Sequence, residues 1–218
     1  MGRNSGGGGG GNPYAGIGKQ AVGVTTNGKV IGAGGMAKLI GSSESLDALP
    51  DREVVKQLRR GISRYEKVMG VRERSIRVAD LDGAYGLTWI NSDGSQGILL
   101  DKKSFSGKRN DVEARYKKKN YETGFKNETN RAIQHTITHE LAHATWTSSY
   151  TGANQRAAGK EIRSLYRQWS ADGSKKGYGT YGKSNVDEFW AEVVTKGIHG
   201  NSDKYTRKAI SIAKKYKL

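Results

Sequence analysis

The feature that most constrains this chain is an H-E-x-x-H pattern formed by His139, Glu140 and His143. In an α-helix, positions four apart lie about one turn apart on the same face, so both imidazoles can reach one metal ion. Glu140 would lie beside that ion, where it can hold a water molecule without binding the metal itself. His135 precedes His139 by one more helical turn. The pattern predicts a helix that provides half of a zinc site, and the alternative is a chance match on an ordinary amphipathic helix.

The composition is that of a chain with one sizeable domain. Its 218 residues include no cysteine, which excludes a disulfide framework, a cysteine-ligated zinc ribbon and thiol catalysis. No apolar run approaches the length of a membrane span, and the N-terminus lacks the apolar segment of a secretory signal. We therefore expect a cytoplasmic or virion-associated protein with no membrane partner.

The chain is strongly basic, with 37 Lys and Arg against 21 Asp and Glu, a formal net charge of +16. A field of this sign attracts nucleic acid or another polyanion. A basic solvated surface without a dedicated partner explains the charge equally well. No zinc-finger, homeodomain or RNA-recognition signature is present, so the charge alone leaves a nucleic-acid partner open.

The first 44 residues form a separate compositional region that contains an uninterrupted glycine run, typical of flexible coil. Residues 21–31 predict a short hairpin around the turn pair Asn27-Gly28. Residues 32–37 also match the dinucleotide-binding pattern G-x-G-x-x-A, but no second parallel strand follows at the right distance. We therefore divide the chain into a glycine-rich flexible arm, residues 1–44, and one domain, residues 45–218.

Hydrophobic periodicity predicts several helices and a small sheet in that domain. The expected helices cover about 51–69, 111–118, 129–146, 154–169, 186–198 and 203–216. The expected strands cover 75–79, 85–90 and 97–100. Ser184 and Asp187 have the spacing of a capping box for the helix that follows. A metal-binding helix, a small sheet and a helical C-terminal part predict an α+β domain.

Two histidines need a third protein ligand to make a catalytic zinc site. A metzincin pattern is excluded because Trp146 and Ser149 stand where Gly and His would be required. Adding His135 would make three consecutive turns converge on one ion. We expect His135 to lie near the metal or face the substrate, with a plain position on the helix face as the alternative. His199 lies at a predicted helix end, where surface histidines are common.

The remaining source is a carboxylate on a later helix. Glu188 and Glu192 are four residues apart and share a face beside apolar positions. Two inward carboxylates are costly unless something positive meets them. We therefore predict Glu188 as the third ligand and Glu192 as the acceptor of the free N–H of a ligating imidazole. A solvated acidic face is the alternative.

The segment from Tyr181 to Glu192, Y-G-K-S-N-V-D-E-F-W-A-E, downstream of H-E-x-x-H, resembles the catalytic domain of anthrax toxin lethal factor, a gluzincin. The resemblance covers roughly residues 129–198 and does not extend to that protein's toxin-binding and substrate-recognition domains. It implies a zincin-like metallopeptidase domain in which Glu188 completes the site of one Zn²⁺ ion. It also implies that Tyr181 faces the zinc-bound water and the substrate carbonyl.

These parts predict a zinc-dependent endopeptidase acting on a protein or peptide substrate. Glu140 would be the general base for a zinc-activated water. The hydroxyl of Tyr181 would stabilise the oxyanion, with Tyr178 as an alternative donor. The strand at 97–100, or its neighbour, could offer an edge to an extended peptide.

A second hypothesis is a basic nucleic-acid-associated or phage virion structural protein. Its zincin domain would then serve self-processing or be inactive. A short chain with a glycine-rich tail and no export signal is typical of a phage product.

Overall fold

The computed structural model of the protein describes residues 21–22, 38–70, 75–82, 85–90, 96–121, 131–148, 152–172, 178–200 and 202–218. The glycine run, the expected Asn27-Gly28 turn and the 32–37 pattern lie outside these residues. Most of the arm expected over residues 1–44 is therefore outside the described part.

The described chain is α+β, as expected. Its helices are α1 (Arg52–Met69), α2 (Lys102–Phe105), α3 (Arg109–Tyr116), α4 (Ala132–Ser148), α5 (Gly152–Ala171), α6 (Val186–Ile198) and α7 (Lys204–Tyr216). Its strands are β1 (Ala21–Val22), β2 (Lys38–Ser45), β3 (Ser75–Asp82), β4 (Gly86–Ile90) and β5 (Gln96–Asp101). Single turns form η1 (Leu46–Ala48), η2 (Lys117–Tyr121) and η3 (Tyr181–Lys183). Among these helices, none has both the length and the apolar character needed to cross a membrane.

The sheet is mixed and has the strand order β1-β4-β5-β3-β2. β3 runs parallel to β5, while β4 and β5 are antiparallel, as are β2 and β3. β5 contains the segment 97–100 that we expected could offer an edge. It lies inside the sheet instead, because it pairs with β4 on one side and β3 on the other. Its neighbour β4, the other strand expected as an edge, pairs with β1 only at Trp89 and Ile90 among the described residues.

The sheet also includes residues on the N-terminal side of the boundary expected after residue 44. β2 covers Lys38–Ser45, so the sheet begins within the segment assigned to the arm. This segment is a strand because its backbone pairs with a neighbouring strand, and not because its side chains alternate between apolar and polar. The β2 backbone pairs with β3, and Arg77 of β3 donates to the Ser43 hydroxyl at 2.8 Å and to the Ser43 backbone oxygen at 2.7 Å.

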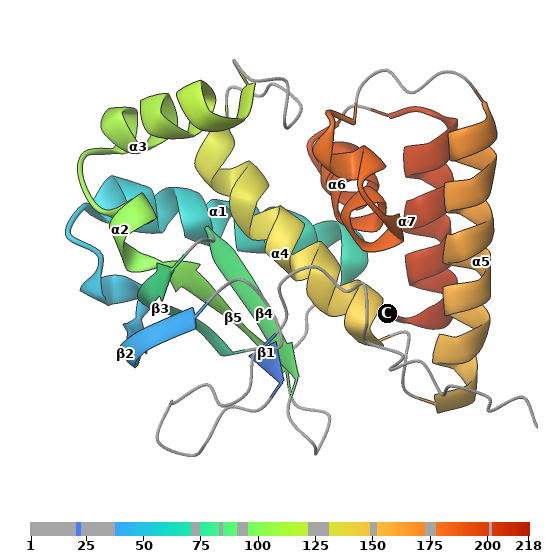
Figure 1. Ribbon diagram of the computed structural model, residues 1–218, viewed down its shortest axis with the longest axis horizontal. Helices are drawn as coiled ribbons and strands as arrows, with labels where there is room; N and C mark the ends of the chain where they lie inside the picture. Colours follow the sequence, from blue (N-terminus) through green and yellow to red (C-terminus); the bar gives the residue numbers. More distant parts are fainter. Residues whose placement is uncertain are drawn as a thin grey trace, which may run out of the picture.

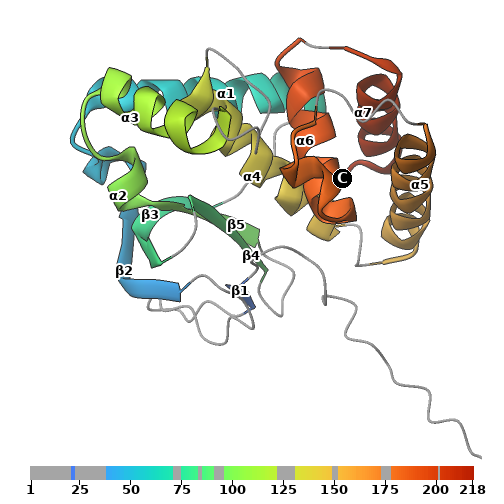
Figure 2. The same ribbon diagram turned by 45° about the horizontal axis from the view of Figure 1, so that its top comes forward.

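α4 is the central element of the molecule (Figure 1). α1, α3 and α4 lie over one face of the sheet, and α5, α6 and α7 form a helical group beyond α4 (Figures 1 and 2). Contacts join α4 to α1, to β4 and to α6. Every residue of α4 from Ala132 to Thr145 is buried. The helix predicted from H-E-x-x-H is therefore the one that the other elements enclose.

Buried polar residues of α4 find partners within the helix itself. The hydroxyls of Thr136, Thr138 and Thr145 each donate to the carbonyl oxygen four residues earlier at 3.0 Å. A buried hydroxyl without a partner would cost about 1–3 kcal/mol. Self-pairing therefore lets α4 be covered on all sides.

α1 approaches α4 closely at Gly61. A Cβ added there would lie 3.0 Å from the backbone oxygen of Gln134 and would overlap the Cγ2 atom of Ile137. Beside this contact, Nε2 of Gln134 donates to Oε1 of Gln57 at 2.6 Å. The absence of a side chain at Gly61 thus allows the two helix backbones to meet and the two amides to bond.

Candidate metal centre

His139 and His143 lie on one face of α4, one turn apart. Their Nε2 atoms are 3.1 Å apart, and the rings meet edge to face with centroids 4.7 Å apart. The two residues are 1% and 5% exposed. The spacing read from the sequence therefore brings both imidazoles to one buried point.

Glu188 reaches the same point from the first turn of α6. The side chain of Asn185 caps this helix by accepting from the backbone N–H groups of Asp187 and Glu188, each at 2.9 Å. The expected capping box from Ser184 to Asp187 was wrong by one residue. Asn185 has an extended backbone, with φ of −163°, which places its amide oxygen over those two N–H groups. This cap fixes the turn that presents Glu188 to α4.

Three ligand atoms converge between α4 and α6. Oε2 of Glu188 lies 3.3 Å from Nε2 of His139 and 3.2 Å from Nε2 of His143. Tetrahedral bonds of about 2.0–2.1 Å to one ion would place the ligand atoms about 3.3–3.4 Å apart. The observed triangle of 3.1, 3.2 and 3.3 Å is close to that requirement. The buried group His139, His143 and Glu188 could hold a metal ion.

Burial and charge oppose each other in this group. Burial alone would lower the pKa of His143, but Glu188 and, less strongly, Glu140 and Asp187 raise it to about 9. Burial would raise the pKa of Glu188, but His143 and His139 hold that pKa well below its ordinary value. The carboxylates around His143 thus stabilise positive charge at this point.

Glu192 contacts the other side of His139. Its Oε1 atom lies 2.9 Å from Nδ1 of His139, and Glu192 is fully buried. A carboxylate at the second ring nitrogen fixes the tautomer and the orientation of an imidazole, which leaves Nε2 available as a ligand. The sequence predicted Glu192 as the acceptor of an imidazole N–H, and the structure places its carboxylate beside this ring.

Glu140 extends toward β4, where Gly86 leaves room for it. A Cβ added to Gly86 would lie 2.6 Å from Cδ and 2.8 Å from Oε1 of Glu140. Thr88, two residues along β4, donates its hydroxyl to the backbone oxygen of Glu140 at 3.1 Å. Gly86 was not among the residues predicted for the site. Its position within a predicted strand could have indicated it, since a glycine in a strand often marks a place where another group approaches the backbone closely.

His135 and His199 meet each other on the side of α4 that bears Thr138. Their ring centroids are 5.5 Å apart, and Nε2 of His199 lies 3.0 Å from the Thr138 hydroxyl. Burial, together with Arg64 and Arg131, lowers the pKa of His199 to about 4. Neither histidine is one of the three residues whose ligand atoms converge. His135, expected near the metal, has a helix-end histidine as its ring neighbour.

Of the two tyrosines considered as oxyanion donors, Tyr178 has another role. Its hydroxyl donates to Oδ2 of Asp203 at 2.6 Å, and burial, reinforced by Asp203, raises its pKa well above the ordinary value. The backbone of Tyr181 lies in η3, but its side chain is outside the described part. An added Cβ on the next residue, Gly182, would be 3.4 Å from Cβ of Glu192. The role of Tyr181 stays a prediction.

Comparisons of the chain with protein-family models, with curated proteins and with solved structures gave no match. No related protein therefore supplies a role for these side chains. Their chemistry has to be inferred from their own geometry.

Proposed function

We propose that the protein is a zinc-dependent endopeptidase of the gluzincin type. The observation that supports this most is the buried triangle of two imidazole nitrogens and one carboxylate oxygen with sides of 3.1–3.3 Å. Two His and one Glu are a ligand set of catalytic zinc sites, which keep a fourth position for water. His139, His143 and Glu188 would hold the ion, and Glu192 would orient His139.

Zinc bound here would supply the reactive water, because it would lower the pKa of that water toward neutrality. Glu140 accepts the proton of that water and later delivers it to the leaving amine. The position of Glu140 supports this role, because it directly follows the first ligand on α4 and its carboxylate lies beside Gly86 of β4. The hydroxyl of Tyr181 stabilises the oxyanion that develops on the substrate carbonyl.

The substrate is an extended peptide that lies along β4. Gly86 of this strand contacts the carboxylate of Glu140, so a chain paired with β4 would pass beside the general base. Among the described residues, β1 pairs with β4 only at Trp89 and Ile90, and no other strand covers the outer side of Gly86–Thr88. Main-chain hydrogen bonds to such an edge bind a peptide with little dependence on its side chains.

The test combines metal content with activity. The wild-type chain and Glu140→Gln, both expressed with zinc supplied, should contain one zinc per chain by elemental analysis. Glu140→Gln should cleave a denatured proteome about 10²–10⁴ times more slowly, because it loses the general base. Glu113→Gln on α3 is the matched control and should retain full activity.

Two results would overturn the proposal. One is wild-type protein without stoichiometric zinc. The other is a cleavage pattern, read by mass spectrometry of new N-termini, that is the same for the wild type and for Glu140→Gln.

A further inference from the structure

The outer side of α1 is almost entirely cationic. Seven residues of α1 are exposed, and five of them are basic: Arg52, Lys56, Arg59, Arg60 and Lys67. The other two are Glu53 and Ser63. We call the five basic residues the cationic face of α1. Their spacing places them on successive turns along one side of the helix.

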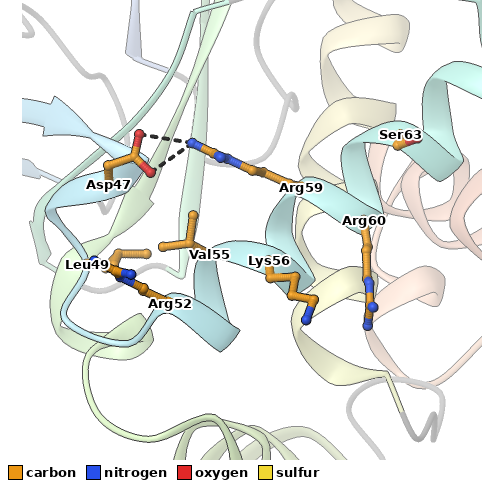
Figure 3. A pocket seen from close by; sticks show the side chains of 8 residues that line it. All are labelled: Asp47, Leu49, Arg52, Val55, Lys56, Arg59, Arg60 and Ser63. Carbon is orange, nitrogen blue, oxygen red and sulfur yellow. Dashed lines mark hydrogen bonds and ion pairs between the residues drawn. The ribbon is translucent and has the colours of Figure 1, made fainter.

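The N-terminal half of this face borders a hollow of about 660 Å³ between α1 and η1. Apolar side chains of Leu49 and Val55 contribute to its lining, with Arg52, Lys56 and Arg60 around them. Figure 3 shows Lys56 and Arg60 projecting to the same side from neighbouring turns. The lining of the hollow thus combines two apolar side chains with four basic ones and one acidic one, Asp47, which is paired with Arg59.

The cations of this face are only weakly engaged within the protein. Arg59 donates to both carboxylate oxygens of Asp47, at 2.8 and 2.9 Å, and Lys56 pairs with Glu53 at 3.2 Å. All four side chains in these pairs are more than half exposed, and such surface pairs contribute little to stability. Arg52, Arg60 and Lys67 form no ion pair within the described part of the chain. The face can therefore neutralise an incoming anion at little cost.

The opposite side of α1 is fixed. Gly61 meets the backbone of α4, and Gln57 bonds to Gln134 at 2.6 Å. The cationic residues consequently stand on a helix that packing holds in place, on the side turned away from α4 and its metal centre. A ligand on this face would leave the β4 side of α4 accessible.

We propose that the cationic face of α1 binds the phosphate backbone of nucleic acid without reading its base sequence. From Arg52 to Lys67 the helix rises about 22 Å, which equals the axial rise of about six base pairs of a duplex. A row of cations of this length suits a repeated anion better than a single phosphate. Three of the five are arginines, whose planar guanidinium groups bind phosphate oxygens in pairs. This inference goes beyond the peptidase activity and does not depend on it.

The test measures binding of the full chain to a fluorescent 20-base-pair DNA duplex by anisotropy, between 50 and 200 mM salt. Five phosphate contacts predict a slope of about −4.5 for log K against log salt. The variant Arg52→Gln/Lys56→Gln/Arg60→Gln should reduce the steepness of this slope by about 2.7 and weaken binding at 50 mM salt. Circular dichroism of each variant verifies its fold.

A control variant separates a local face from overall charge. Arg207→Gln/Lys208→Gln/Lys214→Gln removes an equal number of positive charges, three, from exposed positions of α7. This variant should leave the salt slope unchanged. Equal losses in both variants would overturn the proposal, as would wild-type protein that fails to bind at 50 mM salt. Polyglutamate is the second probe. If it displaces DNA at equal charge concentration, the face takes an acidic protein and the nucleic-acid assignment is wrong.

Discussion

The two sides of the α1–α4 helix pair handle charge in opposite ways. On the inner side, His139, His143 and Glu188 are 1–5% exposed, and their polar atoms are 3.1–3.3 Å apart. On the outer side, the cationic face of α1 lies in solvent, and Arg59 keeps 61% of its side chain exposed even when paired. A buried charge without a partner costs several kcal/mol, whereas an exposed one costs almost nothing. The inner group is therefore characterised by the geometry of atoms that could hold a metal ion, and the outer face by the number and spacing of its charges.

The largest effect should follow from removing the carboxylate at the centre of the buried group. Glu188→Gln takes away a proposed ligand, while Glu192→Gln neutralises the carboxylate that lies 2.9 Å from Nδ1 of His139. Glu192→Gln should weaken zinc binding about 10- to 100-fold, and Glu188→Gln should weaken it more. Competition with a chelating dye measures both affinities. If Glu192→Gln had the larger effect, the two carboxylates would have exchanged roles.

A smaller effect should come from the strand beside Glu140, the proposed general base. In Gly86→Ala the added methyl group would displace the carboxylate of Glu140, because it would lie 2.6 Å from Cδ. A displacement of this kind should lower kcat about 100-fold with zinc content unchanged. Gly197→Ala is the control, since its Cβ would meet Thr206 on α7, at 3.3 Å, rather than the site. Full activity of Gly86→Ala would mean that β4 does not position Glu140.

The smallest effect should come from replacing Asp203. Its side chain is 34% exposed, so its burial is intermediate between that of the buried group and that of the cationic face. It caps α7 by accepting from the N–H groups of Tyr205 and Thr206 at 2.8 and 2.9 Å. Asp203→Ala should therefore lower the free energy of unfolding by about 1 kcal/mol at pH 7.

This loss should depend on pH. Burial would raise the pKa of Asp203, but hydrogen bonds from Tyr178, Thr206 and Lys196 outweigh it and lower that pKa. The folded-state pKa is thus below the unfolded value of about 3.9, so the charged form stabilises the fold above that pH and less as the pH falls further. Urea unfolding of both proteins from pH 7 down to pH 3 measures the difference. A difference that is constant across this range would contradict the assignment.

Much of the centre follows from local spacing in the sequence. His139 and His143, and likewise Glu188 and Glu192, are pairs at i and i+4, so the helix itself places each pair on one face. The cost of burying two carboxylates then required a positive group between α4 and α6. Six of the seven described helices and three of the strands were predicted, most directly where the apolar periodicity is strong, as in α1, α5 and α7. The short helix α2 was not predicted.

The parts that were missed depend on contacts between distant segments. β2 has little periodicity of its own and is held by pairing with β3. The contact of Gly86 with Glu140 and that of His135 with His199 each join separate elements of the fold. The N-cap of α6 is Asn185 rather than the predicted Ser184 for a local reason. Both residue types are good caps, and the extended backbone at Asn185 selects it.

The close approach at Gly61 restricts which other sequences can adopt this fold. A larger residue there would separate α1 from α4 and break the amide bond between Gln57 and Gln134. Distant relatives should therefore retain the spacing Q-x-x-x-G in the first helix, even where most of the surface has changed. That short pattern, followed downstream by H-E-x-x-H, would distinguish such relatives from the many unrelated chains that match H-E-x-x-H alone.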